Sequence, residues 1–228
     1  MPVINKSSLK VQAYNYLKEC ILSGKLESGV LYTEMNLAKE LGISRTPVRE
    51  AVLQLAHEDY VTLKPNKGFL VKTYTIEEIK EYLDVRKAVE GFCGMETLKE
   101  KNTDRWNKLI KKLEKILDEA DMILRKGTDP EGFMKKDAEF HFEIVSFAKN
   151  SQMERIMFDM RDKMNKIGLD SEKIEGRSED TQKEHRAIFE ALKRDDRKAI
   201  YSSYEYHFDK CLDAMQQALV LAEEAQVG

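Results

Sequence analysis

Four side chains suited to a transition metal fall on the apolar faces of three predicted helices in the C-terminal part of the chain. Asp137 and His141 are one helical turn apart in a pattern that predicts a helix over residues 131–149. His185 and His207 occupy inward positions in the next-to-last and last predicted helices. Buried ionisable groups destabilise a fold unless they are paired or bind a metal. One carboxylate and three imidazoles therefore predict a site for a divalent transition metal, with zinc or nickel as the expected ion.

A second interpretation is open for each of these histidines taken alone. A core imidazole can hydrogen-bond a backbone carbonyl or a tyrosine, and that structural role is the more common one. The convergence of four ligand-type side chains on one part of the chain favours the metal. The remaining histidine, His57, stands beside Glu58 and Asp59, and we expect it at the surface.

Arg86 and Glu90 lie four residues apart in the first predicted helix of the same part of the chain. Arg86 belongs to an apolar stripe that includes Leu83 and Val89, so a purely solvated role would be odd. Two roles are open for Arg86. It forms a buried ion pair with Glu90 or another acid, or its planar guanidinium grips the carboxylate of a ligand.

Nearer the N-terminus, Arg45 and Arg49 are also one helical turn apart, at the start of a predicted helix that Ser44 can cap. Arginine matches the N7 and O6 acceptors of guanine. In a helix-turn-helix, the first residues of the second helix meet base edges, and here these include Thr46. The alternative is that both arginines are ordinary exposed side chains.

The elements around these arginines predict a winged helix of about 70 residues. Apolar residues at helical spacing predict one helix over residues 9–22 and a short one between Thr33 and Gly42. After the helix that carries the arginines, residues 60–63 and 68–71 are β-prone and are separated by a basic turn.

The rest of the chain carries almost no strand signal from residue 76 to residue 223. Turn residues divide it into about six helices of roughly 15 to 27 residues, which predicts an antiparallel bundle. The expected fold is therefore mainly α. We expect a winged helix-turn-helix DNA-binding domain over residues 1–74 and a helical effector-binding and dimerisation domain over residues 75–228.

Charge also differs between these two parts. The chain of 228 residues has a formal net charge of −3. Residues 1–74 carry 10 basic and 7 acidic side chains, a net of +3, which leaves 28 basic and 34 acidic side chains, a net of −6, for the remainder. A basic module attached to an acidic one favours nucleic acid as a partner of the first.

Other features of the composition exclude several protein classes. Three cysteines, far apart in the sequence, suggest neither a disulfide framework nor a thiolate metal site. No stretch approaches the ~18 apolar residues of a membrane span, and the first ten residues lack the pattern of a signal peptide. We therefore expect a cytoplasmic protein without a membrane partner.

Residues 9–72 closely resemble the DNA-binding domain of GntR-family bacterial transcription regulators. The resemblance rests mainly on the runs GVLYTE at residues 29–34, LGISRTPVREA at 41–51 and PNKGF at 65–69. It implies that Arg45 and Arg49 read bases. It also implies that phosphates of the DNA are bound by Thr33, Ser44 and Thr46. The wing tip at Lys67 and Gly68 would enter the minor groove.

Residues 76–218 resemble the FCD effector-binding domain of the FadR-like branch of the same family. The similarity rests on the aspartate, the three inward histidines and the run EHRAI at residues 184–188. It implies that these four residues hold a divalent metal and that the metal helps to bind a small carboxylate effector. Arg86 and Asn150 correspond to effector-binding positions, although Asn150 can also cap a helix end.

These observations favour a ligand-responsive transcription regulator, expected to be a repressor, rather than an enzyme. It would bind a palindromic operator in double-stranded DNA as a homodimer, with a small organic acid as effector. Two alternatives are a metal-dependent hydrolase fused to a DNA-binding module and a dimeriser with a purely structural metal. Against the hydrolase, the sequence marks no further acid beside the metal residues as a general base.

Overall fold

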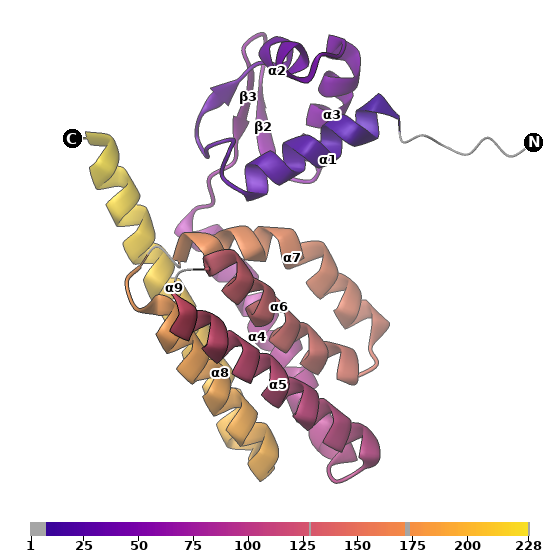
Figure 1. Ribbon diagram of the computed structural model, residues 1–228, viewed down its shortest axis with the longest axis vertical. Helices are drawn as coiled ribbons and strands as arrows, with labels where there is room; N and C mark the ends of the chain where they lie inside the picture. Colours follow the sequence, from indigo (N-terminus) through magenta and orange to yellow (C-terminus); the bar gives the residue numbers. More distant parts are fainter. Residues whose placement is uncertain (1–7, 128, 172–173, 228) are drawn as a thin grey trace, which may run out of the picture. The chain divides into compact units, whose positions relative to one another are not determined.

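The computed structural model describes residues 8–127, 129–171 and 174–227, which divide into two compact units between Tyr74 and Thr75. Three helices and a small sheet form the first unit, and the described helices after residue 75 form the second (Figure 1). This mainly helical architecture, with a winged helix followed by a helical bundle, confirms the predicted fold class.

The first unit buries one apolar core between its helices and its sheet. Leu17, Val52, Leu55 and Phe69 are fully buried there. The elements are α1 (Leu9–Leu22), β1 (Leu31–Tyr32), α2 (Glu34–Leu41), α3 (Arg45–His57), β2 (Val61–Lys64) and β3 (Gly68–Val71). The sequence did not predict β1, because two residues with one side chain exposed carry no usable alternation.

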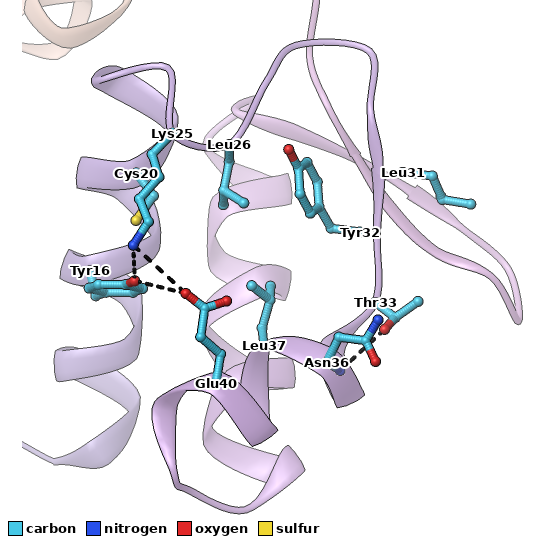
Figure 2. Close-up of a pocket in the computed structure, with 10 residues that line it drawn as sticks. All are labelled: Tyr16, Cys20, Lys25, Leu26, Leu31, Tyr32, Thr33, Asn36, Leu37 and Glu40. Atoms are coloured by element: carbon cyan, nitrogen blue, oxygen red, sulfur yellow. Dashed lines mark hydrogen bonds and ion pairs between the residues drawn. The ribbon is translucent and has the colours of Figure 1, made fainter.

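Capping residues set the helix ends of this unit. The Thr33 hydroxyl accepts a hydrogen bond from the backbone N–H of Asn36 at 3.2 Å and so begins α2 (Figure 2). Gly42 ends α2 in the left-handed conformation, as predicted. Ser44 occupies the N-cap position of α3, but its hydroxyl makes no capping hydrogen bond. The predicted position of the cap is therefore confirmed, but the capping hydrogen bond expected of its hydroxyl is not formed.

The sheet requires a glycine at position 68. Its strands are antiparallel in the order β1-β3-β2, with Tyr32 opposite Phe69. Gly68 has a φ of +124°, and a Cβ atom there would lie 2.0 Å from the carbonyl oxygen of Tyr32. Backbone sterics therefore account for this glycine, whatever contact it makes with DNA.

We expect the substitution Gly68→Ala to destabilise the first unit by about 2 to 4 kcal/mol, through backbone strain and the displacement of β1. Gly24→Ala is the matched control, because Gly24 has a φ of +76° but no atom within 4 Å of an added Cβ. Its expected effect is about 1 kcal/mol. Amide hydrogen exchange of the buried α3 residues measures both, and equal losses would contradict the steric account.

The second unit is a bundle whose successive helices run in alternate directions (Figure 1). The elements are α4 (Ile76–Thr97), the 3₁₀ helix η1 (Leu98–Glu100), α5 (Asp104–Lys126), α6 (Pro130–Phe147), α7 (Ser151–Ser171), α8 (Arg177–Arg194) and α9 (Arg197–Val227). At 31 residues, α9 exceeds the expected length. None of the described helices is long and apolar enough to cross a membrane.

Side chains at the helix ends and between neighbouring helices position the helices of this bundle. Asp129 caps α6 by accepting from the Gly132 N–H, and Asp195, with a φ of 63°, ends α8. The Gln182 side chain donates to the carbonyl of Leu117 and so ties α8 to α5. Trp106, the one tryptophan of the sequence, lies near the start of α5 and is 7% exposed.

Candidate metal centre and nucleic-acid interface

The structure brings the four predicted metal ligands together inside the bundle. Asp137 and His141 from α6, His185 from α8 and His207 from α9 each offer a ligand atom, and these atoms lie within 4.8 Å of one another. The Nε2 atoms of His141 and His185 are 3.1 Å apart, and Oδ1 of Asp137 is 3.3 Å from Nε2 of His185. The helix periodicity placed all four side chains on the buried side, and tertiary packing makes them converge.

The donor set fits a first-row divalent ion. Zinc binds imidazole nitrogen and carboxylate oxygen at ~2.0 to 2.2 Å, so two donors on one ion are at most ~4.4 Å apart. The widest pair in the cluster would therefore close by a few tenths of an ångström around an ion. Three nitrogens and one oxygen suit zinc or nickel better than calcium or magnesium, which prefer oxygen ligands.

A buried acid contacts the outer nitrogen of His141. Oε2 of Glu90 lies 2.5 Å from Nδ1 of His141, but the two atoms are not aligned for a hydrogen bond, and neither has another hydrogen-bond partner. The other oxygen of Glu90 accepts a hydrogen bond from Nε of Arg86 at 2.5 Å. Glu90 is fully buried. The ion pair, one of the two roles open for Arg86, is therefore present.

A second acid contacts His207 in the same way. Oε2 of Glu184 is 2.7 Å from Nδ1 of His207. Both oxygens of Glu184 also accept hydrogen bonds from the two terminal nitrogens of Arg177, at 2.6 and 2.9 Å. All three side chains are buried. Two series of contacts of the same order, from arginine to glutamate to histidine, thus reach the cluster.

The sequence marked no further acid beside the metal residues as a general base, and the structure places Glu90 and Glu184 against ligand histidines. A sequence signal for each existed. Glu90 continues the three-and-four spacing of the buried stripe through Leu83 and Arg86. Glu184 follows Arg177 by two helical turns and so shares its face of α8.

Electrostatics keep Asp137, His185 and His207 in the forms that bind a metal. Burial lowers the pKa of His207 to about 3 and that of His185 below its usual value, so both rings are neutral at neutral pH. Burial alone would raise the pKa of Asp137, but its hydrogen bond with His185 and nearby positive charge hold it well below its usual range. For Glu90, Arg86 and His141 likewise overcome burial and lower the pKa to about 2.

The buried charges do not cancel when all three imidazoles are neutral. With neutral imidazoles, the cluster and its neighbours hold two cations, Arg86 and Arg177, and three anions, which leaves one negative charge in excess. The anions are Asp137, Glu90 and Glu184. An uncompensated buried charge is costly, so the site favours a cation. A divalent ion would change the local sum to one positive charge in excess.

A cavity of about 410 Å³ reaches the cluster from the side of α6 and α7. Its inner wall includes Arg86, Asp137 and His141, and its apolar wall includes Phe142 and Phe158. This volume is in the usual range for small-molecule sites. A separate space of about 30 Å³ next to Asp137 is large enough for water and too small for an organic acid.

Asn150 takes no part in this cavity. Its side-chain oxygen accepts hydrogen bonds from the backbone N–H groups of Gln152 at 3.1 Å and Met153 at 3.3 Å. The side chain therefore caps the start of α7, the second of the two roles considered for it. It lines neither of the two cavities beside the cluster.

The residues expected to contact DNA are grouped on the first unit. Ser44, Arg45, Thr46 and Arg49 are exposed at the start of α3, and Lys67 is exposed on the turn between β2 and β3. His57 is exposed as predicted. The start of α3 thus presents cationic and hydroxyl side chains to solvent, as a recognition helix requires.

Two sets of side-chain contacts connect α2 to the neighbouring helices of this unit. Oε2 of Glu34 accepts from Nε of Arg45 at 2.8 Å and lies 2.6 Å from its Nη2, so the first turn of α2 holds the arginine. A cavity of about 230 Å³ between α1 and α2 is lined by Lys25, whose ammonium donates to the Tyr16 hydroxyl at 2.6 Å beside Glu40 (Figure 2).

Each of the two units matches the model of a known protein family. Residues 9–71 match the family model for "Bacterial regulatory proteins, gntR family", and residues 81–210 match the model for the "FCD domain". The chain is 31% identical to a gluconate operon transcriptional repressor of Bacillus licheniformis, over 90% of this chain and 84% of the relative. It is 25% identical to the regulator YdhC of Bacillus subtilis, over 94% of each chain.

A solved structure of a GntR transcriptional regulator from Rhodococcus sp. RHA1 has a similar fold. It superposes with a TM-score of 0.70 at 22% identity, over 93% of this chain and 98% of that chain.

Proposed function

Since this chain belongs to the GntR family of bacterial transcription regulators and carries an FCD domain, we propose that it is a repressor whose operator affinity responds to a metal-bound organic acid. The family makes it a DNA-binding regulator and not an enzyme. The single observation that carries the rest of the proposal is the buried cluster of one aspartate and three histidines beside a cavity.

The exposed start of α3 supports base reading by Arg45 and Arg49 and phosphate contacts by Ser44 and Thr46. Thr33, the half-buried cap of α2, would contact a further phosphate. Lys67 and Gly68 would enter the minor groove from the wing. One such module offers few base contacts, so the protein would bind a palindromic operator as a homodimer that doubles them. Light scattering on the free protein and on its operator complex tests this assembly, and one monomer per complex would contradict it.

Arg45→Ala tests the DNA interface. We expect the variant to lose ~1 to 3 kcal/mol of binding free energy on the operator and much less on random DNA. Arg45→Lys is the matched control, because it keeps the charge but lacks the planar fork. It should retain the salt dependence of binding while losing most of the sequence preference. An unchanged ratio of operator to random-DNA affinity in both variants would exclude Arg45 from base readout.

The charge balance supports an anionic effector. A bound divalent ion leaves one positive charge in excess, beside a largely apolar cavity. Among the described residues, Arg86 hydrogen-bonds only through Nε, so its two terminal nitrogens can grip a carboxylate. Because two relatives are named gluconate operon repressors, sugar acids belong in the first screen. Phe142 and Phe158 favour acids that also carry an apolar part.

The covalent path from this site to the DNA-binding unit is short. Arg86 lies on α4, and only residues 72–75 join β3 to the start of α4. An effector that binds two arrangements of α4 with different affinity would shift the population between them. The operator affinity would change with that shift.

The hydrolase alternative fails on two grounds. The relatives are named as repressors and regulators, not as enzymes. In addition, the two acids nearest the cluster, Glu90 and Glu184, are already engaged with an arginine and with a histidine Nδ1. Neither is therefore available as a general base for a metal-bound water.

A further inference from the structure

We propose that Glu90 and Glu184 are positioning residues that fix the ring tautomers of His141 and His207, so that Nε2 of each ring faces the metal. This inference rests on the proposed metal site. It adds two residues, and the arginines behind them, to the determinants of metal affinity.

The Glu90 contact sets the proton of His141. An ionised carboxylate can only accept a hydrogen bond, so the 2.5 Å approach of Oε2 of Glu90 favours the tautomer of His141 with its proton on Nδ1, although the two atoms are not aligned for a regular hydrogen bond. A neutral imidazole has one N–H, which leaves the Nε2 lone pair free. That Nε2 is 3.1 Å from Nε2 of His185 and 3.8 Å from Oδ1 of Asp137, at the centre of the cluster.

The Glu184 contact sets the proton of His207 by the same logic. Nδ1 of His207 faces Oε2 of Glu184 at 2.7 Å, which directs Nε2 inward. The Cys211 thiol lies 3.9 Å from that nitrogen. Burial raises the pKa of this thiol to about 11, so it stays protonated and does not replace the imidazole as an anionic ligand.

The arginines prevent each carboxylate from turning away. Glu90 has one oxygen on Arg86 and the other against His141, whereas Glu184 receives a two-point clamp from Arg177. These groups are buried, so water is a poor substitute for either partner. In metal sites generally, such outer partners orient the ligand ring and raise its basicity, and their loss weakens metal binding ~10- to 100-fold.

His185 provides an internal comparison. In the described part of the chain, its Nε2 approaches Asp137 and His141, and no carboxylate pairs with its Nδ1. No outer acid selects the tautomer of His185, and the ionised Asp137 instead favours a proton on its Nε2 in the metal-free protein. We expect this ring, unlike the other two, to change its tautomer population when the metal binds.

The first experiment reads the tautomers directly in metal-free protein. Nitrogen-15 NMR of histidine-labelled protein at neutral pH should show a proton on Nδ1 in His141 and His207. In Glu90→Gln, the His141 signal should move toward a mixture. Glutamine has a single acceptor oxygen, which cannot serve both Arg86 and the ring. An Nε2–H tautomer in the wild-type rings would overturn the proposal, whether or not the protein binds metal.

The second experiment measures affinity for Zn²⁺ and Ni²⁺ alone, by competition with a chromophoric chelator. Glu90→Gln and Glu184→Gln should each bind ~10- to 100-fold more weakly than wild type. The controls are Glu81→Gln on α4 and Glu179→Gln on α8, two exposed acids whose variants should bind normally. Where a glutamine variant does not fold, Arg177→Lys replaces it and should show a smaller loss.

The outcomes separate two failures. Wild type that binds neither ion would refute the proposed metal site, and the tautomer measurement would then decide the positioning role by itself. Wild type that binds metal, together with unchanged affinity in Glu90→Gln and Glu184→Gln, would refute the positioning role alone.

Discussion

Replacing His185 or His207 with alanine should remove the bound ion from the protein. Each variant keeps three of the four ligand side chains but leaves a gap in a buried site, and structural ions with an incomplete shell bind far more weakly. Elemental analysis of wild type should give one zinc or nickel per chain and a value near zero for the variants. His57→Ala, which changes the exposed histidine of the first unit, is the control and should retain the metal.

Loss of the ion should also loosen the bundle. An ion present at about 1,000 times its dissociation constant stabilises the folded state by ~4 kcal/mol. Metal-stripped wild type and both histidine variants should therefore unfold at the same, lower temperature, and added zinc should raise that temperature only in wild type. Full metal content in His185→Ala and His207→Ala would exclude the assigned ligands.

Acidification should have the same effect as the histidine variants. Protons compete with the metal for imidazole nitrogen, whose reference pKa is ~6.5. Burial lowers the pKa of His185 and lowers that of His207 to about 3, so the stabilisation by metal is complete above pH ~6.5 and is lost as the pH falls from there toward about 3. A metal-dependent rise in unfolding temperature that stays constant down to strongly acidic pH would contradict imidazole ligation.

The second large effect concerns Arg86. Its replacement by alanine should weaken effector binding about 100-fold, because truncating one partner of a buried, charge-assisted pair removes several kcal/mol. Stripping the metal should weaken binding as strongly. Isothermal titration calorimetry with a panel of sugar acids and of acids with an apolar part measures both effects. Operator affinity in each state then shows whether the site is coupled to DNA binding.

Arg86→Ala also leaves the fully buried Glu90 without its cation, which by itself would destabilise the bundle. Arg86→Lys keeps the charge and loses only the fork, so it should fold and still lose about tenfold in effector affinity. The exposed α7 residue Arg155 supplies the matched control, because Arg155→Ala should bind the acid normally. Undiminished binding in Arg86→Ala and in metal-free protein would refute the carboxylate clamp.

Sequence periodicity predicted the helices and the direction of their polar side chains. It placed Asp137, His141, His185 and His207 on buried faces because an apolar stripe records which side of a helix faces the core. It did not predict the contact between Glu90 and His141, because His141 lies on another helix and only tertiary packing decides which helix faces meet.

Local signals failed in a different way at Ser44 and Asn150. Both residues suit either a cap or a ligand contact, and composition cannot distinguish the two. In the structure, the Asn150 side chain caps α7, whereas the Ser44 hydroxyl makes no capping hydrogen bond at the start of α3. An uncapped hydroxyl at an exposed helix start is consistent with a phosphate contact.

The place of Trp106 has a practical consequence for following this protein in solution. The indole ring can be excited at wavelengths where tyrosine does not absorb, and the sequence contains one tryptophan, buried on α5 of the second unit. The first unit contains none. Intrinsic tryptophan emission is therefore a built-in spectroscopic label of the bundle alone. A change in that emission when operator is added to unlabelled protein would be an optical record of a signal that crosses from the winged helix to the effector domain.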